Sequence, residues 1–236
     1  MVGGDELYAR IGDAPWAPYK QLITVGGAGG LGSWLSFFLS RIGHSLSVYD
    51  FDAVGNENIG GGQLYGLEHI GQPKTAALKD VLKRFCGDSP YIGLSKFEKG
   101  SAVTPMTIAT FDNMESRMDM YKEWVKLIQR RNGDDKNKYI WAFINISMLP
   151  EGGFIQVVDR PSRMKRWEED WMPSADMPDL ACTFKSTTHN AASVASQAVS
   201  ILNNIVCNKK VTDMPPLHIP YHTRIDNKML MLDHNE

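Results

Sequence analysis

The sequence has few cysteines, no long apolar run and little net charge, and each shortage excludes a class of protein. Cys86, Cys182 and Cys207 form an odd, widely spaced set, so neither a disulfide framework nor a structural zinc site fits. No apolar run approaches the ~20 residues of a membrane span, and the N-terminus lacks the features of a secretory signal. A net charge of −2 argues against nucleic-acid binding. We therefore expect a soluble, cytoplasmic protein with neither nucleic acid nor membrane as partner.

Glycine, in contrast, is well represented, and its most informative cluster follows a short apolar run at residues 22–25. Gly27, Gly29 and Gly32 give the spacing G-x-G-x-x-G, and Ala28 and Gly30 lie among them. The first glycine permits a tight turn, the second lets backbone approach a phosphate, and the third lets a helix pack on a strand. The N-terminus of the following helix attracts an anion. This arrangement favours nucleotide binding over an ordinary glycine turn.

The order of the expected elements predicts the fold class. The 236 residues suit a single domain over 1–236, with a lead-in helix and turn at 1–20 and a C-terminal tail at 208–236. Residues 159–187 show no clear period and are expected to be a crossover loop or lid. Alternating strands and helices predict an α/β, Rossmann-like fold, with helices on both faces of a mostly parallel sheet and a short C-terminal β-hairpin. Strands are expected at 21–26, 45–50, 91–97, 106–111, 139–144 and 154–158, two short strands within 217–232, and helices at 5–11, 31–42, 73–85, 114–131 and 189–206.

Five motifs, taken in order and spacing, resemble the ThiF/MoeB/HesA superfamily, the adenylyltransferases that include ubiquitin-activating enzymes. The resemblance spans roughly residues 8–207 and is greatest to short stand-alone forms similar to those of bacteriophages and plasmids. The motifs are the glycine cluster, then Asp50-Phe51-Asp52, then Asn58, then Gly71-Gln72-Pro73-Lys74, and then Asp112-Asn113 with Arg117.

The resemblance assigns roles to several of these residues. It implies ATP and Mg²⁺ as cofactors, with Asp112 as the metal residue and Asn113 beside it at the nucleotide. At residue 112, a helix N-cap is the structural alternative. Lys74 lies in the first turn of a helix, where a cation is disfavoured unless an anion is near. Lys74 is therefore expected to contact phosphate, and the alternative is a solvent-exposed lysine without this role. Asp50 is expected to bind the ribose hydroxyls.

Other roles follow from the same resemblance. Asn58 is expected to contact phosphate, and Asp52 to organise its loop with a secondary role at the metal. Arg10 resembles an arginine that family members extend across a homodimer interface to the phosphates; a surface arginine is the alternative. Arg117 is expected to brace the Asp112 loop.

Cys182 is the candidate nucleophile. Cys182-Thr183-Phe184-Lys185 resembles the Cys-Thr signature at the thioester cysteine of ubiquitin-activating enzymes. A following helix N-terminus and Lys185 would lower its thiol pKa. The alternative is a buried, inert cysteine. Cys86 and Cys207 are assigned to packing, and His189 is more readily a helix-start residue than a base.

The chain departs from the family pattern in ways that bear on activity. The arginine usually found three residues after the motif asparagine is replaced by Gly61. The paired Cys-x-x-Cys zinc motifs are absent, as is room for a large cysteine domain.

The leading interpretation is an ATP-dependent adenylyltransferase that activates the C-terminal carboxylate of a ubiquitin-like or sulfur-carrier protein, with a thioester on Cys182 as a possible second step. Two alternatives remain at this stage. An NAD-dependent Rossmann oxidoreductase explains Gly27 to Asp50 but leaves Lys74, Asp112 and Cys182 without a role. A non-catalytic relative that binds only nucleotide or partner would fit the glycine at position 61.

Overall fold

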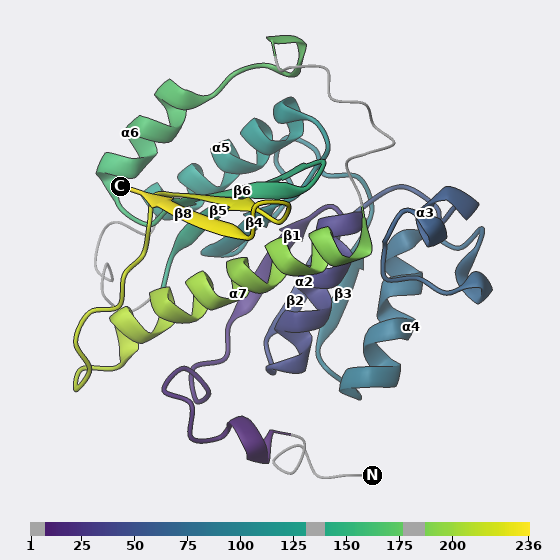
Figure 1. The fold of residues 1–236 in the computed structure, drawn as a ribbon, viewed down its shortest axis with the longest axis horizontal. Coiled ribbons are helices and arrows are strands. Elements are labelled where there is room, and N and C mark those ends of the chain that lie inside the picture. The colour runs from purple at the N-terminus through teal and green to yellow at the C-terminus, as the bar shows by residue number, and fades with distance from the viewer. Residues whose placement is uncertain (1–7, 131–139, 177–186) are drawn as a thin grey trace.

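The computed structural model describes residues 8–130, 140–176 and 187–236, and an eight-stranded sheet forms its centre (Figure 1). The strand order is β3-β2-β1-β4-β5-β6-β7-β8. The pairings from β3 through β5 are parallel, and those from β5 to β8 are antiparallel. The predicted α/β fold, with a mostly parallel sheet and a C-terminal hairpin, is confirmed. The strands are β1 (Leu22–Gly26), β2 (Ser45–Tyr49), β3 (Tyr91–Leu94), β4 (Met106–Ala109), β5 (Ala142–Leu149), β6 (Gly152–Val158), β7 (His222–Asp226) and β8 (Met231–Asn235).

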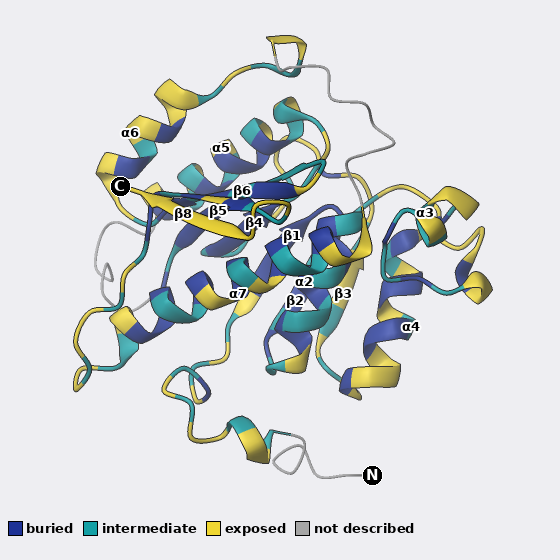
Figure 2. Ribbon diagram, viewed as in Figure 1, coloured by how far each residue is buried: buried dark blue, intermediate teal, exposed yellow. Residues whose placement is uncertain are grey.

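Helices cover both faces of this sheet, as expected. Helices α2, α4 and α7 contribute to one buried apolar cluster, whereas α5 and α6 contribute to a second cluster on the opposite face (Figures 1 and 2). None of the helices within the described ranges is long and apolar enough to cross a membrane. The helices are α2 (Gly30–Arg41), α3 (Asn56–Gly60), α4 (Lys74–Cys86), α5 (Met114–Arg130), α6 (Pro161–Asp170) and α7 (Thr188–Lys210), with 3-10 turns η1 (Ala9–Ile11), η2 (Leu67–His69) and η3 (Ser174–Asp176).

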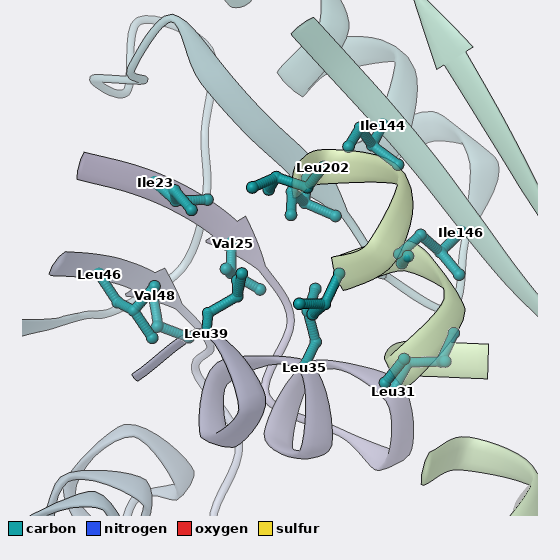
Figure 3. Packing of buried hydrophobic residues seen from close by; sticks show 14 of the residues in the cluster. Ile23, Val25, Leu31, Leu35, Leu39, Leu46, Val48, Ile144, Ile146 and Leu202 are labelled. Carbon is teal, nitrogen blue, oxygen red and sulfur yellow. The ribbon is translucent and has the colours of Figure 1, made fainter. Parts of the chain in front are cut away.

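The larger cluster fixes the first βαβ unit. Val25 of β1 and Leu35 of α2 are fully buried, and Leu202 of α7 packs into the same cluster (Figure 3). Burying one such side chain stabilises the fold by about 1.5–3 kcal/mol. The opposite face holds an aromatic cluster in which Tyr121 of α5 and Trp167 of α6 lie 4.3 Å apart between ring centroids. The sheet edge that carries the motifs is therefore held rigidly from both sides.

The structure differs from the sequence-based expectation in the segment 159–187. Pro161–Asp170 forms helix α6, with Arg163 and Trp167 buried on one face. The helix was missed because residues 161–170 include six charged side chains, and only two positions, 163 and 167, are buried on one face. Cys182 and Lys185 lie outside the described residues.

Smaller differences concern the ends of elements. No helix was expected between 45–50 and 73–85, but α3 (Asn56–Gly60) contains Asn58. In the expected helix at 5–11, the described part is a 3-10 turn, η1. β5 extends five residues beyond the expected end at 144, to Leu149.

Candidate active site

The candidate site lies where β1 and β4 end side by side. The chain leaves β1 toward β2 on one side, whereas β4 is followed by β5 on the other, so the carboxyl ends of β1 and β4 mark the switch point of the parallel sheet. Gly26 pairs with Ala109 in the last register position. Thr110 donates to the Gly26 carbonyl through its main-chain N–H and through its hydroxyl, both at 2.8 Å. These bonds fix the loops that follow the two strands relative to each other.

The three motif glycines differ in what surrounds them. Gly27 has φ +98°, in the region that favours glycine. A Cβ on Gly32 would lie 1.9 Å from the Gly27 carbonyl oxygen, so α2 packs directly against the turn. A Cβ on Gly29 would meet nothing within 4 Å. Gly27 thus forms the tight turn, Gly29 leaves room for close approach of a ligand, and Gly32 allows the helix to pack on the turn, as the motif predicts.

Asp50 follows β2 and joins the glycine turn. Its Oδ2 accepts the Ala28 main-chain N–H at 2.7 Å, and its Oδ1 accepts the Asp52 N–H at 2.9 Å. Burial raises the pKa of this carboxyl, and the two hydrogen bonds oppose that shift. Each carboxylate oxygen retains a further lone pair, so Asp50 can still accept hydrogen bonds from hydroxyl groups.

Lys74 begins α4 and is buried, with only 7% of its surface exposed. Its Nζ lies 3.0 Å from Asp52 Oδ2, and its main-chain N–H donates to the Asp52 carbonyl at 2.9 Å. Asp52 therefore holds the start of α4 and supplies the anion that a lysine at a helix N-terminus requires. The ion pair uses one of three donors on Nζ and leaves two for another acceptor.

Asp112 follows β4, and its side chain is exposed. Its alternative role as a helix N-cap is excluded, because Asn113 Oδ1 accepts the Ser116 N–H at 2.8 Å and caps α5. Asn113 Nδ2 also donates to Asp112 Oδ1 at 3.2 Å. No group of three or more His, Cys, Asp or Glu side chains in the described ranges could hold a metal ion. A Mg²⁺ ion at Asp112 would thus take most of its ligands from phosphate and water, as is usual for this metal.

Arg117 braces the loop before Asp112, as expected. It is buried, and its Nε donates to the Phe111 carbonyl at 2.7 Å. Its Nη1 donates to Asn145 Oδ1 and the Ile146 carbonyl, both at 2.7 Å, and to Ser147 Oγ at 2.9 Å. Burial lowers the pKa of its guanidinium to about 10, opposed by the charge of Asp112. Arg117 thereby links the ends of β4 and β5.

Two further candidates are less clearly placed at this edge. The amide oxygen of Asn58 accepts the Gly55 N–H at 2.8 Å, so half of its amide serves α3. Arg10 lies exposed in η1, and none of the hydrogen bonds or ion pairs among the described residues joins it to the sheet edge. The predicted phosphate contacts of both residues remain predictions.

Sequence reasoning missed a set of bonds that attaches the segment after α3 to the start of α2. The Tyr65 hydroxyl donates to the Ala28 carbonyl in the glycine turn. The Leu64 N–H donates to Ser33 Oγ at 3.1 Å, and Trp34 Nε1 donates to the Gly62 carbonyl at 2.8 Å. A single tyrosine after a glycine run gives no sequence signal for such contacts. The glycine turn is therefore supported from its outer side as well.

Comparisons with known proteins agree with this geometry. Residues 19–126 match the model of the ThiF family, which confirms the resemblance drawn from the motifs. Over 132 residues, the chain is 26% identical to tRNA threonylcarbamoyladenosine dehydratase 2 of Saccharomyces cerevisiae; the match covers 50% of this chain and 30% of that protein. The chain thus spans less than a third of this relative.

Similar solved structures show the same fold. E. coli MccB with ATP has a TM-score of 0.62 at 12% identity, covering 94% of this chain and 64% of that one. The microcin C7 biosynthetic enzyme MccB in complex with N-formylated MccA has a TM-score of 0.65 at 12% identity, covering 94% and 65%. PaaA has a TM-score of 0.65 at 15% identity, covering 100% of this chain and 84% of that chain.

Proposed function

We propose that this chain, whose residues 19–126 match the ThiF family, is an ATP-dependent adenylyltransferase that activates the C-terminal carboxylate of a peptide or small carrier protein. In this reaction, a carboxylate oxygen of the substrate forms a bond to the α-phosphorus of ATP. The bond from that phosphorus to the bridging oxygen of the β-phosphate breaks, and pyrophosphate leaves with both bonding electrons. The product is an acyl-adenylate.

One observation carries the proposal: the open glycine turn, the Asp50 carboxylate that follows β2 and the buried Lys74 are connected at one edge of the sheet. Asp50 bonds to both Ala28 of the turn and Asp52, which in turn pairs with Lys74. An NAD-dependent oxidoreductase would need the first two features but gives no role to a lysine held by a carboxylate. The lysine therefore favours phosphate chemistry over hydride transfer.

The residues of the chain would divide the work as follows. The open N–H groups at the start of α2 and the free donors of Lys74 would hold and neutralise phosphate oxygens. Asp50 would accept hydrogen bonds from the ribose. Asp112 is exposed two residues after Thr110, which bonds to Gly26, and would hold Mg²⁺; that ion supplies further charge neutralisation on the phosphates when it is bound. Arg117 would keep Asp112 in place without touching the nucleotide.

The substrate class rests on the relatives. MccB structures with ATP and with the peptide MccA support ATP and a peptide or carrier-protein tail here as well. A ubiquitin-like or sulfur-carrier protein remains the finer version of this proposal. The family likeness also supports a homodimer in which Arg10 of one protomer serves the phosphates of its partner, and a cytoplasmic location. In a second step, the thiolate of Cys182 would form a bond to the acyl carbon of the adenylate, and AMP would leave with the electrons of the broken carbon–oxygen bond.

ATP–pyrophosphate exchange tests the proposal. The full chain is incubated with Mg²⁺, labelled pyrophosphate and candidate peptides or carrier proteins, each with a free or an amidated C-terminus. We expect exchange only with the free carboxylate. Asp112→Asn should reduce it at least about 100-fold, whereas Asp119→Asn, the same change on the exposed surface of α5, should not.

Three results would overturn it. Binding of NAD without binding of ATP would favour the alternative function, an NAD-dependent oxidoreductase. Exchange with a tRNA-borne carboxylate alone, tested because of the yeast relative, would change the substrate class. ATP binding with no exchange for any carboxylate tested would indicate a non-catalytic relative.

A further inference from the structure

One main-chain N–H of the glycine turn has no partner although the groups around it are bonded. The Ala28 N–H donates to Asp50 Oδ2 at 2.7 Å, and the Gly29 carbonyl accepts the Ser33 N–H at 3.0 Å. Within the described ranges, no hydrogen bond uses the Gly29 N–H. This N–H is therefore available to a ligand.

A single side chain fixes the peptide group that carries this N–H. The Tyr65 hydroxyl donates to the Ala28 carbonyl at 2.5 Å, and that carbonyl belongs to the same peptide group as the Gly29 N–H. The described residues contain no cis peptide, and the C=O and N–H of a trans peptide point in opposite directions. Because the carbonyl points to Tyr65, the Gly29 N–H points away from it.

Glycine at position 29 makes such a bond necessary. Glycine adopts either sign of φ, so the peptide group before it rotates more easily than one before another residue. Gly29 has φ −75° and is half-buried, and a Cβ built there would meet nothing within 4 Å. Rotation of the peptide group would turn the Ala28 carbonyl away from Tyr65, and its partial negative charge would then repel a phosphate. The Tyr65 bond opposes this rotation.

The surroundings of Tyr65 keep its hydroxyl in place as a donor. Tyr65 is buried, and both burial and the charge of Asp50 raise the pKa of its phenol. The hydroxyl therefore retains its proton at neutral pH. The next residue is held as well, because the Gly66 N–H donates to His69 Nδ1 at 2.9 Å.

We propose that Tyr65 is a positioning residue that aims the Gly29 N–H at a phosphate of the bound nucleotide. The inference deepens the proposed function and rests on it for the identity of the anion. Tyr65 acts through one peptide group and does not itself contact the nucleotide. A hydroxyl 37 residues further along the chain thus sets the affinity for phosphate and leaves the affinity for the nucleoside unchanged.

Nucleotide binding without a carboxylate substrate tests this role separately from adenylation. The full chain, labelled with ¹⁵N, is titrated with ATP–Mg²⁺ and with adenosine, which lacks phosphate, and the Gly29 amide is followed by NMR. In the wild type, we expect ATP but not adenosine to shift this amide. Tyr65→Phe keeps the ring and removes only the hydroxyl. It should weaken ATP binding about tenfold, as for the loss of one hydrogen bond, and leave adenosine binding unchanged.

Tyr49→Phe is the matched control. Tyr49 is 6% exposed and Tyr65 is 7% exposed. The Tyr49 hydroxyl donates to the Ala102 carbonyl at 2.8 Å, in the connection between β3 and β4. Each variant loses a bond from a buried tyrosine to a main-chain carbonyl, so both should lose a similar amount of stability in urea. Only Tyr65→Phe should weaken ATP binding.

The comparison of the two variants decides the outcome. An equal loss of ATP affinity in both would indicate a general effect of lowered stability, and would overturn the inference. Unchanged ATP affinity in Tyr65→Phe would overturn it too, as would a Gly29 amide that ATP does not shift in the wild type. If ATP binds with the expected pattern but pyrophosphate exchange is absent for every carboxylate, the proposed function fails and the role of Tyr65 stands.

If exchange is present, steady-state kinetics distinguish positioning from a structural effect. Tyr65→Phe should raise the KM for ATP about tenfold and leave the KM for the carboxylate substrate unchanged, because the lost interaction serves only the phosphates. A similar rise in both KM values would mean that the whole edge of the sheet is disturbed, and would contradict the positioning role.

Discussion

Lys74 Nζ lies 3.0 Å from Asp52 Oδ2, and the same two residues are joined by a main-chain hydrogen bond of 2.9 Å. The lysine is 9% exposed at its side chain and the aspartate 51%, so the pair extends from the interior to the surface. Such a pair keeps a cation in place and leaves its outer side open to an anionic ligand.

Replacing Lys74 by methionine should separate the roles of its charge and its stem. Methionine retains most of the apolar contact, so we expect little change in melting temperature but a loss of at least about 100-fold in pyrophosphate exchange. Asp52→Asn should cost less activity, because Lys74 remains, but more stability, about 1–3 kcal/mol, because the buried cation loses its partner. Circular dichroism melts and exchange assays on both variants provide the comparison. Full pyrophosphate exchange in Lys74→Met would show that Lys74 does not take part in the reaction.

The glycine turn gives a matched pair of substitutions. Gly32→Ala places a Cβ 1.9 Å from the Gly27 carbonyl oxygen and should destabilise the fold by about 1–3 kcal/mol or more. Gly29→Ala has open space and φ −75°, so the fold should be unaffected while ATP binding weakens, because the methyl group obstructs a phosphate. Thermal melts with and without ATP distinguish them. Undiminished ATP binding in Gly29→Ala would place the phosphates elsewhere.

Cys182 can be tested independently of its position. Cys182→Ala should retain pyrophosphate exchange, which precedes acyl transfer, and lose any thioester with the carrier. Non-reducing gels before and after thiol treatment detect that bond. Cys86→Ala is a suitable control, since Cys86 is buried and burial raises the pKa of its thiol to about 11. A thioester that survives in Cys182→Ala would assign the nucleophile to another residue.

His44 should make the fold sensitive to acid. Its Nδ1 accepts the Gln21 N–H at 3.0 Å, and burial lowers its pKa from 6.5 to about 4. Between these values, the unfolded chain binds more protons than the native chain. Stability from this residue is therefore present above pH 6.5 and is lost as the pH falls toward 4, by about 3 kcal/mol in total. Urea unfolding of the wild type and of His44→Asn, which keeps an acceptor but does not titrate, measures the difference. If the free energy of unfolding changed with pH in the same way in the wild type and in His44→Asn, His44 would not be the source of the acid sensitivity.

Sequence reasoning located the motif-bearing edge well, because local chemistry determines it. The turn at Gly27, the acid after β2 and the proline before Lys74 each have a backbone requirement that their residue type reveals. Asp112 illustrates the limit. Its position alone left open whether it binds a metal or caps the following helix, and the cap was excluded only by the hydrogen bond from the Ser116 N–H to Asn113 Oδ1.

The parts that were missed depend on contacts between distant segments. Helix α6 has its apolar face only where Trp167 meets Tyr121 of α5, and its other residues read as solvent-exposed. Tyr65 acquires its role from the Ala28 carbonyl, 37 residues earlier in the chain. Neither contact leaves a periodic signal in its own segment. Arg117 was expected to act as a brace, but its bonds to β5 required the register of the sheet.

The position of β1 at the centre of the parallel part of the sheet has a consequence for folding. β1 pairs with β4 along a four-residue register that begins at Ile23 and Met106. Thr24 also exchanges two hydrogen bonds of 3.0 Å with Thr104, which precedes β4 and lies 80 residues away in the chain. The hairpin partners β5–β6 and β7–β8 are neighbours along the chain. Contacts between residues far apart in the sequence form slowly, because closing the long loop between them costs entropy before the contact stabilises the chain. We expect the hairpins to form early and the edge with the glycine turn to be completed late, so a partly synthesised chain that ends before β4 would carry the motif without the ability to bind a nucleotide.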